Sequence, residues 1–293
     1  MSRRGWLLFV ALCLIWGVPY LLIRVAVREL SPPALILLRT GPAALLLLPL
    51  ALREGGLRAV LARWRWVAAY TAAEIAVPWL LLFHAEQRLA SSLAGLLVAT
   101  VPLLGAVLYR LTGTESGFGA RRVAGLLLGF AGVAALMGLD VGGGEVAGLA
   151  VLEVLGVAVC YALGPLVIAR RLQDVPGHGV VTVSLALTAL AYLPAGLLTW
   201  PQRVSWETAA ATAVLAVVCT AVAFVLFFAL VREAGPSRTT VITYVNPLVA
   251  VVLGVLLLNE PLTAGMLAGT PLILAGSVLG TAGGRAATAP SPD

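Results

Sequence analysis

Long apolar runs separated by short polar segments fill almost all of the 293 residues. A helix needs about 20 consecutive, mostly apolar residues to cross a bilayer. Ten runs satisfy this requirement, so the pattern predicts an all-α integral membrane protein with ten transmembrane helices. The predicted spans are residues 6–27, 33–52, 66–84, 90–110, 122–139, 146–169, 179–200, 207–231, 238–258 and 262–282.

The first run follows Arg3 and Arg4, as the apolar part of a signal peptide would. It lacks a small-residue cleavage site and is followed by further spans, so we expect an uncleaved first helix.

Composition supports the membrane interpretation. The chain is 61% hydrophobic and only 11% charged, whereas a soluble domain carries about 25% charged residues. Length alone would also allow two soluble domains, but this composition argues against them.

The 19 basic residues are all Arg, and their distribution predicts the orientation. With the N-terminus inside, fourteen Arg fall in cytoplasmic segments and three in outer segments, while Arg24 and Arg39 lie within spans. This bias follows the positive-inside rule. It predicts a multi-pass protein of the inner (cytoplasmic) membrane with both termini cytoplasmic, and it explains the basic charge better than nucleic-acid binding does. Without Lys, the chain has no Walker-type phosphate loop.

Two stretches of the chain resemble each other at a spacing near 145 residues. The run Leu96–Leu111 matches Val241–Leu258, with Pro102 opposite Pro247, and Gly125–Val133 matches Gly269–Ser277. Each copy contains five predicted spans, and an odd number places the two copies in opposite orientations in the membrane. The sequence therefore predicts two inverted five-helix repeats, residues 1–140 and 141–284, followed by a disordered tail at 285–293. Inverted repeats are common in secondary transporters that work by alternating access.

Several motifs resemble the drug/metabolite transporter superfamily, specifically its EamA-type ten-helix members. They are Ile15–Gly17 in the first span, Ser31–Arg39 at the second, the run from Leu46, and Leu257–Leu279 with its Asn259–Glu260–Pro261. The resemblance implies an exporter of small metabolites, amino acids or drug-like compounds, with a cavity between the two halves, and not an enzyme. The first half departs from the family pattern in two places. It has Thr114–Glu115–Ser116 in place of the second-half motif, and Val18, Pro19 and Arg24 follow Trp16–Gly17 where the family often has Asn and Lys.

Charged, aromatic and polar residues inside the spans are the candidates for the substrate cavity, because such groups at membrane depth usually face a cavity or a partner. The cavity candidates are Trp16, Tyr20, Glu74, Trp79, Tyr161, Tyr244 and Asn246. Glu74 is the candidate for cation binding or proton coupling, and its structural alternative is an ion pair with Arg39. Arg39 has Glu153 as a second possible partner, or extends outward. We expect Arg24 to extend toward the interface and His84 to be interfacial.

Other features point to packing and not to cofactor chemistry. Cys13, Cys160 and Cys219 lie far apart in apolar runs, and with two His the sequence supports no metal site and no cofactor. Glycines of the fifth and tenth spans allow close helix packing, at the ends of the bundle or in a dimer contact. The expected partners are a small-molecule substrate and the lipid bilayer, and the chain is either a monomer or a homodimer. A lipid translocator and a membrane-embedded enzyme are the competing functions.

Overall fold

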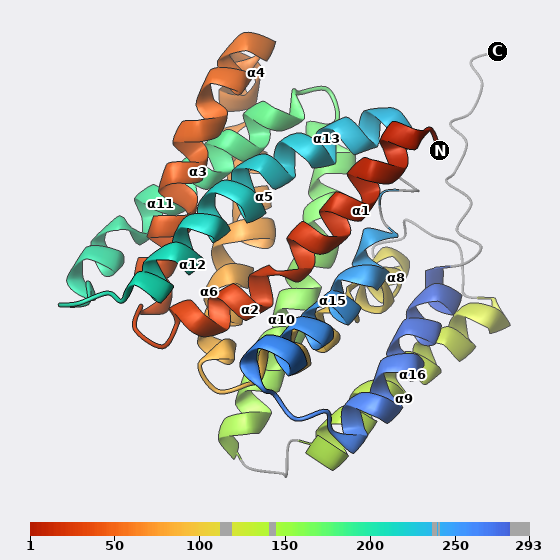
Figure 1. Cartoon of the computed structure of the whole chain (residues 1–293). Coiled ribbons are helices and arrows are strands. Elements are labelled where there is room, and N and C mark those ends of the chain that lie inside the picture. Colours follow the sequence, from red (N-terminus) through yellow and green to blue (C-terminus); the bar gives the residue numbers. More distant parts are fainter. Residues whose placement is uncertain (112–118, 141–144, 236–238, 240, 282–293) are drawn as a thin grey trace, which may run out of the picture.

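The computed structural model describes residues 1–111, 119–140, 145–235, 239 and 241–281, and within these ranges the regular structure is helical (Figure 1). In the first half the helices are α1 (Arg3–Gly17), α2 (Pro19–Ala26), α3 (Pro32–Glu54), α4 (Leu57–Ala62), α5 (Trp64–Thr71), η1 (Ala72–Ala76), α6 (Val77–Glu86), α7 (Ser91–Val98), α8 (Val101–Leu111) and α9 (Ala120–Asp140). In the second half they are α10 (Glu145–Val167), η2 (Ile168–Leu172), α11 (Gly177–Leu198), α12 (Trp206–Ala216), η3 (Val217–Val222), α13 (Ala223–Ala234), α15 (Ile242–Leu258) and α16 (Ala264–Thr281).

Within the described residues, seven helical stretches are long and apolar enough to cross a membrane. They are Arg3–Ala26, Pro32–Glu54, Trp64–Glu86, Ser91–Leu108, Gly148–Leu172, Gly177–Leu198 and Trp206–Ala234. The helices α9, α15 and α16 supply the remaining three spans. The predicted ten-helix membrane fold is thus confirmed. The motif at Thr114–Ser116 and the tail at 285–293 lie outside the described residues.

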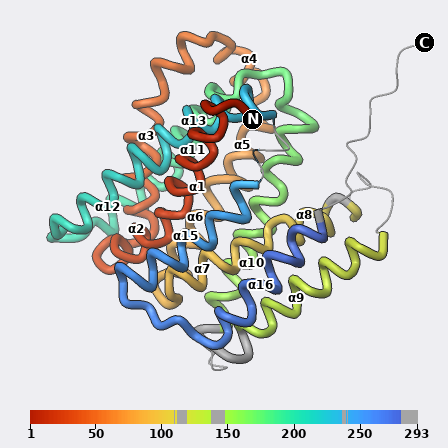
Figure 2. Tube along the Cα trace, turned by 45° about the vertical axis from the view of Figure 1, so that its right-hand side comes forward, coloured from red at the N-terminus to blue at the C-terminus, as the bar shows by residue number. Residues whose placement is uncertain are grey.

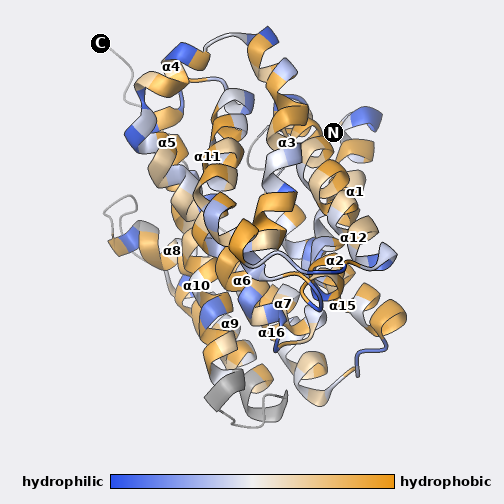
Figure 3. Cartoon of the chain, turned by 90° about the vertical axis from the view of Figure 1, so that its left-hand side faces the viewer, coloured by the Kyte–Doolittle hydropathy of each residue, from blue (hydrophilic) through white to orange (hydrophobic). Residues whose placement is uncertain are grey.

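Large apolar side chains cover the flanks of the bundle, as expected for a surface that faces lipid. Leu198, Leu45 and Leu127 are 87%, 71% and 67% exposed, although burying such a side chain in a soluble protein is worth about 2 kcal/mol. Figure 3 shows hydrophobic residues along the helices and hydrophilic residues gathered at the two ends. We call the end that carries Arg63 and Arg171 the Arg-rich end.

The two halves share an irregular helical turn at equivalent positions. A π-helical turn begins at Ala72 in η1 and another begins at Val217 in η3, which are 145 residues apart. A π turn contains one residue more than the α-helical turn it replaces, and such turns are common at functional sites. Because this spacing equals that of the sequence repeat, the halves share this irregularity, whereas the π-helical turn η2 has no counterpart at the equivalent place in the first half.

Contacts between the halves come in symmetric sets. The helices α3 and α11 pack together, and so do α9 and α16, each pair being equivalent spans of the two repeats (Figures 1 and 2). The contact of α6 with α10 has its counterpart in the contact of α13 with α1. Each half therefore packs its third span against the first span of the other half, as expected for two inverted five-helix repeats.

Glycines let α9 and α16 approach until their backbones touch. A Cβ atom on Gly276 would lie 2.4 Å from the backbone nitrogen of Gly129, and a Cβ on Gly125 would lie 2.4 Å from that of Gly280. The small-residue faces noted in the sequence therefore pack on each other within one chain. Figure 2 shows the two helices side by side along one edge of the bundle.

Candidate functional site

A guanidinium lies buried between aromatic rings and the second half of the chain. Arg39 of α3 is 6% exposed, and its Cζ is 3.7 Å from the ring centroid of Trp79 on α6 and 5.9 Å from that of Phe83. Its Nε donates a hydrogen bond to Thr220 Oγ1 in η3, 3.0 Å away. A cation over an indole face is stabilised by the ring's quadrupole, most strongly when both are desolvated. Arg39 thus connects the two halves without using a carboxylate.

Three further polar side chains lie close enough to this guanidinium to act on it electrostatically, and a fourth lies beside one of them. Tyr20 of α2, Tyr161 of α10 and Glu86 of α6 interact electrostatically with Arg39. Tyr161 also interacts electrostatically with Glu74 in η1. We call the following residues the central cluster: Arg39, Trp79, Thr220, Tyr20, Tyr161, Glu74 and Glu86. Among the described residues, the structure shows no ion pair between Arg39 and a carboxylate, so the predicted pairing with Glu74 or Glu153 is not made.

Glu74 lies at the contact between the halves because of a glycine on the facing helix. A Cβ atom at Gly164 of α10 would be 1.8 Å from Glu74 Oε2, so only glycine leaves room for this carboxylate. The buried Oε2 has no hydrogen-bond partner within the described structure. An unsatisfied buried carboxylate oxygen is costly, which makes it a candidate to bind a proton or a cationic group.

Glu86 is a member of the cluster that sequence reasoning missed. The predicted third span ends at residue 84, so Glu86 lies outside the predicted spans and is not among the candidates. In the structure it is 0% exposed, and neither carboxylate oxygen has a hydrogen-bond partner among the described residues. Arg24 was expected to extend toward the interface, but its guanidinium donates to the backbone carbonyl of Glu86. The sequence signal that could have identified Glu86 is its place on the same helical stretch as Glu74, about 18 Å farther along the helix at 1.5 Å per residue.

Glu153 and His84 form a separate polar contact near the end of the bundle. Glu153 of α10 accepts from Arg88 and lies 2.7 Å from His84 Nδ1. His84 is half exposed, in keeping with the predicted interfacial position. The contact joins α10 to the end of α6, so the structure gives Glu153 a partner other than Arg39.

Three further candidates contact other helices. Trp16 packs edge-on against Phe224, with ring centroids 6.2 Å apart. In the amide orientation that satisfies its hydrogen bonds, Asn246 Nδ2 donates to the carbonyl oxygens of Cys13 and Ile242, each 3.1 Å away. The Tyr244 hydroxyl donates to the carbonyl of Ser277 over 3.4 Å. The first contact holds α1 against α13 and the other two hold α15 against α1 and α16, and none of them reaches Arg39.

The aromatic residues follow the repeat, whereas the charged residues do not. At the spacing of 145, Trp16 corresponds to Tyr161 and Phe224 to Trp79, so aromatic residues occupy the same positions in both halves. Arg39 corresponds to Ser184 and Glu74 to Cys219. The charged groups of the central cluster therefore all come from the first half. No group of three His, Cys, Asp or Glu residues able to hold a metal is found in the described ranges.

A carboxylate from the second half caps a helix of the first half at the end opposite the Arg-rich end. Glu260 Oε1 accepts from the backbone nitrogen and hydroxyl of Ser91 at 2.7 and 3.0 Å, and Oε2 accepts from those of Ser92 at 3.0 and 2.6 Å. Asn259, with φ of 53°, turns the chain back toward α7. A carboxylate at a helix N-terminus satisfies otherwise unbonded N–H groups and interacts favourably with the helix dipole.

We expect Glu260→Gln to lower stability at neutral pH by about 1–3 kcal/mol, because an amide cannot accept all four bonds. Partial burial acts to raise the pKa of Glu260, but hydrogen bonds from Ser92 and Ser91 outweigh it and hold the pKa below its ordinary value of 4.5. A lowered folded-state pKa gives stability that is present above the ordinary pKa and is lost as pH falls through the folded-state value. Melting temperatures of both proteins should therefore converge as the pH falls below the ordinary pKa and through the lowered folded-state pKa. The exposed Glu207 provides the control, and an equal loss in Glu207→Gln would contradict the capping role.

Comparison with known proteins identifies the family. The EamA-like transporter family matches residues 3–138 and 148–281, which together make up most of the chain. The chain belongs to the EamA-like transporter family. Its relatives include the uncharacterized transporter YvbV of Bacillus subtilis (strain 168), 31% identical over 284 residues that cover 93% of this chain and 90% of YvbV. Another is the uncharacterized inner membrane transporter YedA of Escherichia coli (strain K12), 28% identical over 262 residues that cover 86% of this chain and 82% of YedA.

A solved crystal structure has the same fold as this EamA-like chain. It superposes with a TM-score of 0.67 over 96% of this chain and 97% of the other, at 22% sequence identity. Similarity at this identity concerns the fold alone. The family and the relatives' names agree with the transporter class, so the central cluster lies inside a multi-pass membrane transporter.

Proposed function

We propose that the protein is a secondary transporter that exports a small zwitterionic solute, such as an amino acid, by alternating access between its two halves. The observation that carries the proposal is the central cluster. It contains a buried guanidinium that has no carboxylate partner in the described structure, and two buried carboxylates, Glu74 and Glu86, with unbonded oxygens. The family resemblance supports export, and the Arg distribution supports an inner-membrane protein with both termini cytoplasmic.

The chemistry of the cluster suits a solute that carries both charges. An ionised side chain inside a membrane span costs about 2.5–3.5 kcal/mol on insertion scales. A solute carboxylate can pair with Arg39 and its ammonium group with Glu74 or Glu86, so a bound zwitterion offsets charges of both signs. The aromatic faces of Trp79 and Tyr161 are suited to contact an apolar side chain of the solute.

Contacts at both ends of the bundle support alternating access. At the Arg-rich end, His178 Nδ1 of α11 lies 2.8 Å from Glu54 Oε2 of α3. At the opposite end, Ser31 and Thr199 are hydrogen bonded at 2.6 Å, and Glu260 caps α7. Each of these contacts joins one half to the other. Breaking one set while keeping the other would open the central cluster to one side of the membrane only.

Uptake into proteoliposomes tests the function. Labelled zwitterionic amino acids would be compared with the matching amines, which lack the carboxylate, and the matching acids, which lack the ammonium group, with and without a pH gradient. We expect transport of zwitterions and at least about tenfold less of either analogue, because each leaves a buried charge unpaired. Preferred transport of the amines would favour drug-like cations. Movement of labelled lipid without solute transport would favour a lipid translocator.

We expect Glu74→Gln to reduce zwitterion uptake at least about tenfold, because the amide keeps the shape of the side chain but cannot pair with an ammonium group. The protein should remain folded, since removal of an unpaired buried charge does not lower stability. Initial rates measured over a range of pH would show whether Glu74 also couples protons. Glu207→Gln is the control, and wild-type rates with wild-type pH dependence in Glu74→Gln would exclude this role.

A further inference from the structure

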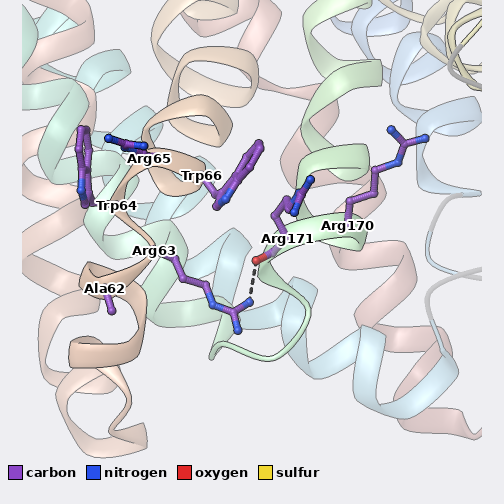
Figure 4. Close-up of a pocket in the computed structure, with 7 residues that line it drawn as sticks. All are labelled: Ala62, Arg63, Trp64, Arg65, Trp66, Arg170 and Arg171. Carbon is purple, nitrogen blue, oxygen red and sulfur yellow. Dashed lines mark hydrogen bonds between the residues drawn. The ribbon is translucent and has the colours of Figure 1, made fainter.

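A pocket of about 560 Å³ opens at the Arg-rich end, lined from both halves of the chain. Its lining residues are Ala62, Arg63, Trp64, Arg65, Trp66, Arg170 and Arg171 (Figure 4). The first five come from the end of α4 and the start of α5, and the last two from η2. We infer that this pocket binds the phosphate headgroup of an anionic phospholipid.

The pocket is positively charged, and one of its arginines, Arg63, bridges the two segments that line it. Four of its seven lining residues are Arg and none is acidic. Arg63 donates to the backbone carbonyl of Arg171 over 2.7 Å and pairs with Asp174 at 3.3 Å, which offsets one of the four charges. Figure 4 shows Arg63 reaching across to the backbone of Arg171, with the Trp66 ring beside the Arg171 side chain. The exposed guanidinium groups of Arg65 and Arg171, on opposite sides of this bridge, carry positive charge that suits a phosphate group.

Tryptophans place the pocket at the depth of lipid headgroups. Trp64 and Trp66 are 61% and 41% exposed, and the Cζ atoms of Arg65 and Arg171 lie 5.6 and 4.5 Å from their respective ring centroids. Trp is enriched where a membrane meets water, because its ring is apolar and its N–H is polar.

The lining residues also lie at span ends. The third span begins at Trp64 and the sixth ends at Leu172, so the arginines sit where a lipid phosphate would be. A soluble anion would not require the exposed rings beside the arginines. Basic pockets between transmembrane helices are known to bind anionic headgroups.

Native mass spectrometry of the purified full-length protein in detergent tests the inference. Phosphatidylglycerol would be titrated in parallel with phosphatidylcholine of the same acyl chains, and inorganic phosphate would be added as a competitor. We expect phosphatidylglycerol to bind in preference to phosphatidylcholine, and phosphate alone not to displace it. Equal binding of the two lipids, or displacement by phosphate at matched concentration, would overturn the proposal.

Matched variants locate the site. Arg65→Gln with Arg171→Gln should weaken phosphatidylglycerol binding about 30-fold, at about 1 kcal/mol per Arg near a membrane surface. Arg58→Gln with Arg232→Gln removes the same charge from exposed positions at the same end that do not line the pocket, and should bind as the wild type does. Arg65→Lys with Arg171→Lys should restore most of the affinity. An equal loss in both Gln pairs would show a diffuse charge effect and overturn the site.

Discussion

Replacing Arg39 by Gln is expected to reduce solute transport about 100-fold, because loss of a buried charge partner costs about 2–5 kcal/mol. Gln can still donate to Thr220, so the variant removes the charge and the stacking on Trp79 and leaves a donor in place. Initial uptake rates in proteoliposomes would measure the effect. Size-exclusion profiles and melting temperatures would show that the variant remains folded.

Two further substitutions make this result specific. Arg39→Lys keeps the charge but loses the planar group over Trp79 and the bond from Nε, so an intermediate rate is expected. Arg28→Gln removes an exposed Arg just after α2 and should leave transport within about twofold of the wild type, since exposed charges contribute little. Uptake by Arg39→Gln at the Arg28→Gln level would remove Arg39 from the solute site.

The largest expected effect on stability comes from Gly276→Ala, at about 3 kcal/mol. The new Cβ would lie 2.4 Å from the backbone nitrogen of Gly129 and 2.6 Å from the carbonyl oxygen of Gly125. Since both atoms belong to the backbone of α9, no side chain can rotate away and the helices must separate. Melting temperature in detergent is the measurement.

Gly41→Ala is the matched control, because a Cβ at Gly41 would meet nothing within 4 Å. Alanine favours a helix over glycine by about 1 kcal/mol, so this variant should be as stable as the wild type or slightly more so. A fall in melting temperature equal to that of Gly276→Ala would mean that α9 and α16 do not pack backbone to backbone.

The fold was predictable because it depends on the length of the apolar runs and on the repeat spacing, which are properties of the linear sequence. Apolar length located the spans, and each described span lies within a few residues of its predicted range. The repeat spacing then predicted which helices are equivalent. The sequence also identified the glycines as packing residues, but it could not show that those of α9 face those of α16, since that choice depends on how the helices are arranged in three dimensions.

The candidate site was only partly predictable. Arg39, Glu74 and Trp79 were identified from residue type and position. A charged residue inside a span usually faces a cavity or a partner, and aromatic residues in the spans were candidates for the cavity wall. Glu86 and Thr220 were missed for opposite reasons. Glu86 lies at the end of a helix, where sequence reasoning assumes contact with water, and Thr220 is a polar residue that a helix can satisfy by itself: its hydroxyl donates to the carbonyl of Leu215. Both acquire their importance from the tertiary structure, which buries Glu86 and brings Thr220 to Arg39 of the other half.

The equivalent π-helical turns η1 and η3 have a consequence for the history of the chain. An extra residue at the same place in η1 and η3 is most simply explained by one insertion in an ancestral five-helix unit, made before that unit was duplicated. Around it the copies have diverged so far that Glu74 now stands where the other half has Cys219. The turn is thus shared by both halves although the side chain it carries is not, so the halves have backbone shape, and not charge, in common at this site.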